Sequence, residues 1–90
     1  MHESIRILLE ICLLNNYIGG RHTPERKLLN KVLRNSTKEQ RREFMKDYKK
    51  LQNSYLILRE KKRTGKDYDW HISLNPRHLA TAKEVLDEDR

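Results

Sequence analysis

Residues 55–74 read YLILREKKRTGKDYDWHISL, and this stretch decides what fold to expect. Its first five residues, Tyr55 to Arg59, form an apolar run of strand length that includes a β-branched residue. Its last seven, Tyr68 to Leu74, alternate apolar and polar side chains with the period of two that is typical of a half-buried strand. Residues 61–67 between them are basic and turn-forming, with Gly65 as the expected positive-φ position. The stretch therefore predicts a β-hairpin with a basic turn.

The aromatic residues of this stretch have two possible roles. The alternation puts Trp70 on the same side of the second strand as Ile72 and Leu74, which predicts that Trp70 belongs to the core. The alternative is that Tyr55, Tyr68 and Trp70 stack on single-stranded bases.

Two helices are expected in the first part of the chain. The first, at about residues 3–17, is rich in Ile and Leu without a two-residue alternation, and Gly19-Gly20 is expected to end it. Its apolar positions cover most of its circumference, so it is either a central helix surrounded by its own domain or in part a dimer seam. The second, at about residues 24–34, is expected to use Thr23 as its N-cap and Pro24 as its first helical residue.

A third helix and a last helix flank the hairpin. The third is expected at about residues 37–52, beginning with the S-x-x-E capping box of residues 36–39. Its core face is Phe44, Tyr48 and Leu51, at helical spacing. After the hairpin, Asn75-Pro76 begins the last helix, at about residues 76–88.

The positive charge is concentrated in the middle of the chain. The 90 residues carry 20 Lys and Arg against 13 Asp and Glu, a formal net charge of +7. Residues 21–66 hold sixteen of these bases and five of the acids, for +11, whereas residues 1–20 and 67–90 balance at −1 and −3. This distribution indicates a surface for a polyanion, with nucleic acid as the first candidate. The length supports one domain, residues 1–90, with little room for a buried active-site cleft.

Several other classes of protein are not expected. The single Cys12 cannot form an internal disulfide or supply a cysteine-based zinc site, and it is expected to be a small core residue. The four His lie at no metal-ligand spacing, and no catalytic or phosphate-loop motif is present, so neither an enzyme nor a cofactor is expected. No apolar run approaches the about 20 residues of a membrane span, and no signal peptide begins the chain. We expect a cytoplasmic, nucleoid-associated protein without a membrane partner.

The order helix, helix, helix, strand, basic turn, strand, helix resembles the winged helix-turn-helix family over nearly the whole chain. The likeness is to the small basic DNA-binding regulators that are common in archaea and their viruses. Its most specific part is residues 51–59, which resemble the junction between recognition helix and wing, followed by residues 63–66 as the wing tip. Family members often have Gly where Asn53-Ser54 stands, but Asn also tolerates a left-handed backbone. The fold class expected is α+β, mostly helical: a winged helix-turn-helix with three helices, a hairpin wing and a C-terminal helix.

The resemblance implies that the third helix reads the major groove and that the wing contacts the flanking backbone or minor groove. Arg and Gln near a helix start can pair with base edges, whereas Lys suits phosphates. The base readers expected on this ground are Gln40, Arg41 and Arg42. The phosphate contacts expected are Lys38, Lys46, Lys49 and Lys50 on the helix, and Lys61, Lys62, Arg63 and Lys66 on the wing.

The function expected is sequence-specific binding of double-stranded DNA by a homodimeric transcriptional regulator. Helix 1 and the last helix would form the dimer seam and set the two recognition helices about one DNA turn apart. Two alternatives stay open. One is non-specific DNA or RNA binding by a chromatin- or ribosome-associated protein, and the other is a winged helix that docks an acidic protein.

Overall fold

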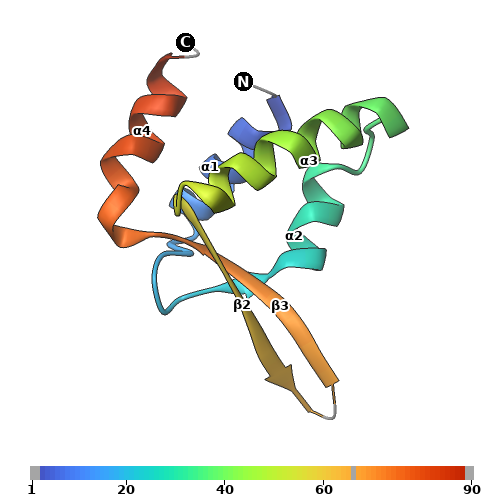
Figure 1. Ribbon diagram of the computed structural model, residues 1–90, viewed down its shortest axis with the longest axis vertical. Coiled ribbons are helices and arrows are strands. Elements are labelled where there is room, and N and C mark those ends of the chain that lie inside the picture. Colours follow the sequence, from blue (N-terminus) through green and yellow to red (C-terminus); the bar gives the residue numbers. More distant parts are fainter. Residues whose placement is uncertain (1–2, 66, 89–90) are drawn as a thin grey trace.

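The computed structural model describes residues 3–65 and 67–88. Within them the elements follow the order α1 (Glu3–Leu14), β1 (Thr23–Pro24), α2 (Glu25–Val32), α3 (Lys38–Asn53), β2 (Ile57–Thr64), β3 (Asp67–Leu74), the 3₁₀ turn η1 (Pro76–His78) and α4 (Leu79–Glu88) (Figure 1). The three strands form one antiparallel sheet with the order β1-β3-β2. The α+β class predicted from the sequence is confirmed.

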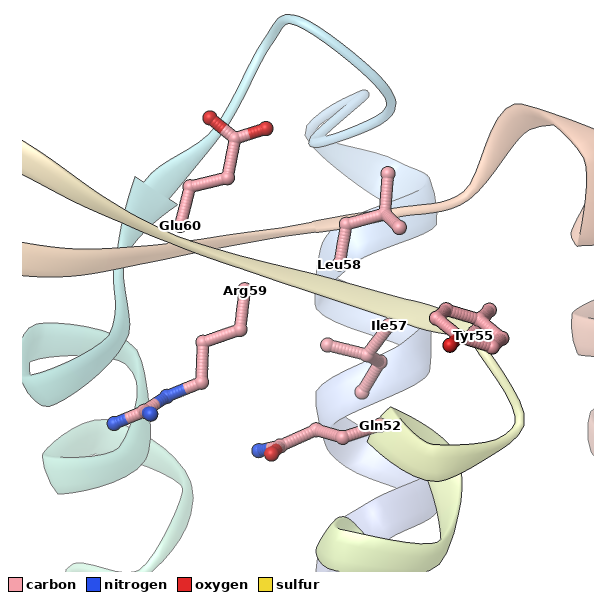
Figure 2. A pocket seen from close by; sticks show the side chains of 6 residues that line it. All are labelled: Gln52, Tyr55, Ile57, Leu58, Arg59 and Glu60. Atoms are coloured by element: carbon pink, nitrogen blue, oxygen red, sulfur yellow. The ribbon is translucent and has the colours of Figure 1, made fainter.

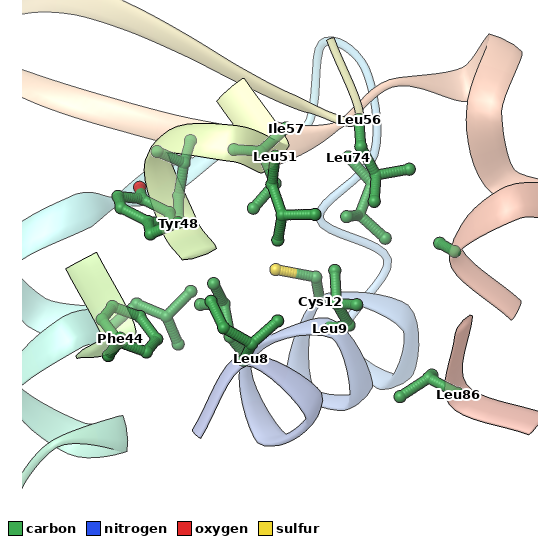
Figure 3. Packing of buried hydrophobic residues seen from close by; sticks show 14 of the residues in the cluster. Leu8, Leu9, Cys12, Phe44, Tyr48, Leu51, Leu56, Ile57, Leu74 and Leu86 are labelled. Atoms are coloured by element: carbon green, nitrogen blue, oxygen red, sulfur yellow. The ribbon is translucent and has the colours of Figure 1, made fainter. Parts of the chain in front are cut away.

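The core is built around α1. Ile5, Leu8 and Leu9 have no exposed surface, and Cys12 is 1% exposed. Figure 3 shows the buried side of α1 turned toward the core residues of α3 and the sheet. Because α1 contacts α2, α3, α4 and β3, the domain itself covers most of this helix, as the first of the two alternatives above expects. Burial raises the pKa of the Cys12 thiol to about 12, so this cysteine is an inert core residue, as predicted.

The first helix is shorter than the sequence predicts. It ends at Leu14, because Asn16 takes a positive φ of 55° and turns the chain. The following loop is drawn to β3: the Tyr17 carbonyl accepts the N–H of Leu74, and the Gly19 N–H donates to the Leu74 carbonyl at 2.9 Å. Gly19 has a φ of 61°, so this glycine serves the loop rather than the helix end.

The expected start of the second helix is also wrong. Thr23 and Pro24 form β1, where Thr23 lies opposite Ile72, and α2 begins only at Glu25 without a side-chain cap. Pairing with β3 holds Pro24 in an extended conformation, with a ψ of 126°, which is incompatible with the first turn of a helix.

The third helix begins one residue later than its expected capping box. Thr37, not Ser36, is the N-cap, and its side-chain oxygen accepts the backbone N–H of Gln40 at 3.1 Å. The Gln40 side chain in turn accepts the Thr37 N–H at 2.8 Å, which completes the box. The core face of α3 is as predicted, with Phe44, Tyr48 and Leu51 buried.

The hairpin has longer strands and a shorter turn than predicted. β2 runs to Thr64, so Lys61, Lys62 and Arg63 are paired strand residues opposite β3 and do not belong to the turn. Gly65 has the predicted positive φ, at 63°, and Lys66 lies outside the described residues. In Figure 1 the outer half of the hairpin extends beyond the helices.

The junction between α3 and β2 adopts its left-handed conformation at Tyr55, with a φ of 62°, and not at Asn53, which is the last residue of the helix. The Asn75 side chain donates to the Tyr55 carbonyl at 2.9 Å and accepts the Arg77 N–H at 3.0 Å. Asn75 is therefore the predicted cap, although the first turn after it is 3₁₀ and α4 begins at Leu79.

Replacing Tyr55 by Gly should stabilise the protein, because a left-handed backbone is strained for a tyrosine and free for a glycine. The Tyr55 side chain is 67% exposed and contributes little packing. We expect the free energy of unfolding, measured by urea titration, to rise by about 1 kcal/mol. Tyr68→Gly, which removes an exposed tyrosine from an extended strand, should lower it. Destabilisation by Tyr55→Gly would contradict the strain at this junction.

Candidate nucleic-acid interface

The outward surface of α3 is basic. With Phe44 at the centre of the core face, four exposed cations lie between about 120° and 200° around the helix. We call them the basic face of α3: Lys38, Arg42, Lys46 and Lys49. The acids of the helix lie outside this arc, on one flank at about 220° to 300°: Glu39, Glu43 and Asp47. The basic face is thus a row of cations about 16 Å long without an interrupting carboxylate.

Lys50 does not belong to this face. It lies at about 240°, between Glu39 and Glu43 on the acidic flank of the helix. Its side chain is exposed, and Asp47 lies three residues, about one turn, before it. Among the lysines expected to hold phosphates, Lys38, Lys46 and Lys49 share one surface with Arg42, and Lys50 does not.

Two of the three expected base readers have structural contacts. The Gln40 side chain completes the capping box of α3. The Arg41 guanidinium donates to the Leu33 carbonyl at 3.1 Å, and this carbonyl at the end of α2 also accepts the Ser36 N–H. Arg42 is exposed near the middle of the basic face, so it is the residue of the three best placed to meet a ligand.

The strand register gives the hairpin two unlike faces. Directly paired residues of antiparallel strands point to the same side of a sheet, and Lys61 is paired with Trp70 as Arg63 is with Tyr68. We call this side the cationic–aromatic face: Arg59, Lys61, Arg63, Tyr68 and Trp70. The other side carries Glu60, Lys62, Asp69 and His71, in which acids and bases are mixed. Figure 2 shows this alternation on β2, with Arg59 on one side of the strand and Leu58 and Glu60 on the other.

The expectation that Trp70 is a core residue is wrong. Trp70 is 40% exposed, and Tyr68 is 59% exposed. The alternation does put Trp70 on the side of the buried Ile72 and Leu74, but this part of the hairpin lies beyond the helices that cover those two residues. The Arg59 guanidinium lies 3.9 Å from the centre of the Trp70 ring, and the Lys61 ammonium lies 5.6 Å from that of Tyr68. Each exposed ring therefore has a cation beside it.

The expected wing cations divide between the two faces of the hairpin. Lys61 and Arg63 belong to the cationic–aromatic face, whereas Lys62 points to the other side. There Lys62 forms an ion pair with Glu60 at 2.9 Å, and this hydrogen bond holds the pKa of Glu60 below its ordinary value. Lys66 is outside the described residues.

A carboxylate connects α3 to the hairpin. Glu25, at the start of α2, accepts hydrogen bonds from the Tyr48 hydroxyl at 2.7 Å and from the Arg59 Nε and Nη2 at 2.6 and 2.9 Å. The second interaction is a two-pronged ion pair, the strongest arrangement available to an arginine and a carboxylate. Because Tyr48 belongs to α3 and Arg59 to β2, Glu25 fixes the two elements relative to each other.

The contact shifts the pKa values of these three residues. Partial burial alone would raise the pKa of Glu25, but the hydrogen bonds from Arg59 and Tyr48 outweigh it and hold this pKa below its ordinary value. Burial, followed by the hydrogen bond to Glu25, raises the pKa of Tyr48. The hydrogen bond to Glu25 also raises the pKa of Arg59. At neutral pH the cluster therefore consists of a carboxylate, a neutral phenol and a guanidinium.

Two shallow hollows lie beside this contact. One, of about 210 Å³, lies between α3 and β2 and is lined by Glu25, Met45, Tyr48, Lys49, Gln52 and Arg59. The other, of about 250 Å³, lies at the end of α3 and is lined by Gln52, Tyr55, Ile57, Leu58, Arg59 and Glu60 (Figure 2). The first hollow joins the basic face of α3, through Lys49, to the cationic–aromatic face of the hairpin, through Arg59.

A pair of histidines was not expected from the sequence. The Nδ1 atoms of His22 and His71 lie 2.7 Å apart, and their rings meet edge to face. The two residues are 49 positions apart, so the pairing of β1 with β3, and no sequence motif, brings them together. In residues 3–65 and 67–88 no three His, Cys, Asp or Glu side chains gather in a way that could hold a metal ion. None of the described helices has the length and hydropathy that a membrane span requires.

No protein-family model, no curated protein and no solved structure matches this chain. The function proposed below therefore rests on the geometry of the interface.

Glu25→Gln should show how much the fold depends on the Glu25 contact. Because the pKa of Glu25 lies below its ordinary value of 4.5, its contribution is complete above that value and is lost as the pH falls. We expect the variant to be less stable than the wild type by about 2 kcal/mol at pH 7 and the difference to shrink toward pH 3.

The measurement is urea unfolding of both proteins across this pH range. Glu84→Gln, which removes an exposed carboxylate from α4, is the matched control and should have little effect. A Glu25→Gln difference that stays constant from pH 7 to pH 3 would argue against an ionised Glu25 in this contact.

Proposed function

We propose that the chain binds double-stranded DNA as a winged helix protein, with α3 in the major groove and the hairpin beside it. The observation that carries this proposal is the basic face of α3, four exposed cations in a row with the carboxylates of the helix kept to one flank. The element order supports the resemblance to winged helices, with the short β1 added between α1 and α2.

The chemistry of the basic face suits a duplex. A helix fits the major groove, where an Arg can pair with both acceptors of a guanine and a Lys meets phosphate as a point charge. We assign base reading to Arg42 and phosphate contacts to Lys38, Lys46 and Lys49. The contacts of Gln40 and Arg41 within the protein argue for a supporting role, in which they fix the start of α3. Among the wing cations, Lys61 and Arg63 are our candidates for the flanking backbone or a narrow minor groove.

Arg42→Ala should weaken binding to a duplex selected from a random pool, and Lys46→Ala should weaken binding to any duplex, both measured by fluorescence anisotropy on labelled duplexes. Each phosphate contact that is lost should lower the slope of log affinity against log salt by about 1. Lys83→Ala, which removes an exposed cation from α4, is the matched control and should bind like the wild type. Affinity that does not depend on salt, or that is unchanged in both α3 variants, would refute the proposal.

A competition experiment separates the alternatives within this proposal. A sequence-specific regulator should bind a duplex selected from a random pool about 10³ times more tightly than random duplex. A chromatin- or ribosome-associated protein should bind random duplex or structured RNA about as well as the selected one. A protein that docks an acidic partner should bind none of them at low salt. The first outcome is the one we expect, and it implies a location on the nucleoid.

We also propose that the active form is a homodimer through α1 and α4. The observation in favour is that α1, although central, leaves apolar side chains outside: Ile7 is 39% exposed and Leu14 is 83% exposed. Sedimentation equilibrium should give twice the mass of one chain, and Leu14→Asp should shift the protein toward the monomer. A wild type that stays monomeric at all concentrations would exclude the dimer without affecting DNA binding by the monomer.

A further inference from the structure

The outer hairpin exposes two aromatic rings that the helices do not cover. Tyr68 and Trp70 lie on one face of β3, two residues and thus about 7 Å apart, with 59% and 40% of their surfaces exposed. The packing of the domain does not require rings at these positions, since the core on this face of the sheet ends at Ile72. Exposed aromatic rings on one surface indicate a ligand with flat faces of its own.

The charges around these rings identify the kind of ligand. The partner strand places Arg59, Lys61 and Arg63 on the same face, and the acids of the hairpin point to the other face. Glu25, the carboxylate nearest to Arg59, is already occupied by Arg59 and Tyr48. Rings between cations match a polymer with flat bases and a negative backbone. The faces of paired bases are hidden by stacking, and only their edges and phosphates are accessible in a duplex. Two exposed rings therefore fit unpaired bases better than an intact duplex.

We propose that the cationic–aromatic face of the hairpin binds a single-stranded stretch of nucleic acid, with one base on Tyr68 and one on Trp70. Lys61 and Arg63 hold the phosphates between these bases. Arg59 is fixed by Glu25 and lies over the Trp70 ring, so it holds the ring in place while a base stacks on the exposed part of the ring. This site is separate from the basic face of α3 and does not require that α3 bind a duplex.

Trp70 is the one tryptophan of the 90 residues, so its fluorescence reports directly on this site. Titration with a 12-nucleotide oligothymidylate at low salt should quench the Trp70 emission. A DNA duplex of the same length, without unpaired bases, should quench it much less. The same titration with oligouridylate tests an RNA strand, and tighter binding of either one identifies the preferred kind of single strand. Absence of quenching with both single strands would overturn the proposal.

Variants test which side chains hold the single-stranded nucleic acid. Their affinity for a labelled oligothymidylate is measured by fluorescence anisotropy. Tyr68→Ala and Trp70→Ala should each weaken binding at least about fivefold, the smallest loss expected for one stacked base. Tyr55→Gly removes an exposed tyrosine outside this face and should bind like the wild type. Lys61→Gln should weaken binding more than Lys62→Gln, which changes a lysine on the opposite face. Unchanged affinity in both ring variants, or an equal loss in Tyr55→Gly, would refute the assignment.

The outcomes for the two sites can be told apart. Arg42→Ala and Lys46→Ala should leave single-strand quenching largely intact, because these residues belong to α3. If duplex binding fails and quenching persists, the hairpin site stands alone. If Tyr68→Ala and Trp70→Ala weaken the duplex and the single strand equally, the two rings contact the duplex, as Lys61 and Arg63 are proposed to do, and the present inference is wrong. The far-ultraviolet circular dichroism spectrum of each variant checks that it is folded.

Discussion

The arrangement of this domain depends on one carboxylate. Glu25 is 13% exposed at the side chain and accepts hydrogen bonds from α3 through Tyr48 and from β2 through Arg59. Arg59 in turn lies over Trp70 on β3, so a single chain of contacts runs from the start of α2 to the outer sheet. A hairpin joined to the helices only through its inner end could swing relative to them. With Glu25 in place, the basic face of α3 and the cationic–aromatic face of the hairpin keep one relative orientation.

The parts of the fold that could be predicted are those with a local signal. The three-residue core face of α3 follows from helical spacing, and the positive φ of Gly65 follows from turn chemistry. The strand β1 could not be predicted, because Thr23-Pro24 reads as a helix start and only its pairing with distant β3 makes it extended. The prediction that Trp70 is a core residue was wrong for a related reason. Alternation gives the side of a strand on which a residue lies, but not how far the covering helices reach.

In the candidate site, too, the sequence predicts only some of the roles that the side chains have. Helical spacing places Lys38, Arg42, Lys46 and Lys49 on one surface of α3, and all four are exposed. Spacing does not show which polar side chains the fold itself uses. Gln40 closes a capping box and Arg41 binds a helix-end carbonyl, and both contacts depend on where helices begin and end to within one residue. Element boundaries are what a sequence pattern determines least well.

The sheet order β1-β3-β2 has a consequence for the behaviour of the protein in concentrated solution. β2 is an edge strand of eight residues, and its outer N–H and C=O groups form a template that a second copy could extend. Residues 59–63 of this strand are five charged residues in a row, four of them positive. Two such edges repel each other, so sheet-to-sheet growth is opposed by the same cations that attract a polyanion. Neutralising them would remove a safeguard against aggregation as well as a binding surface.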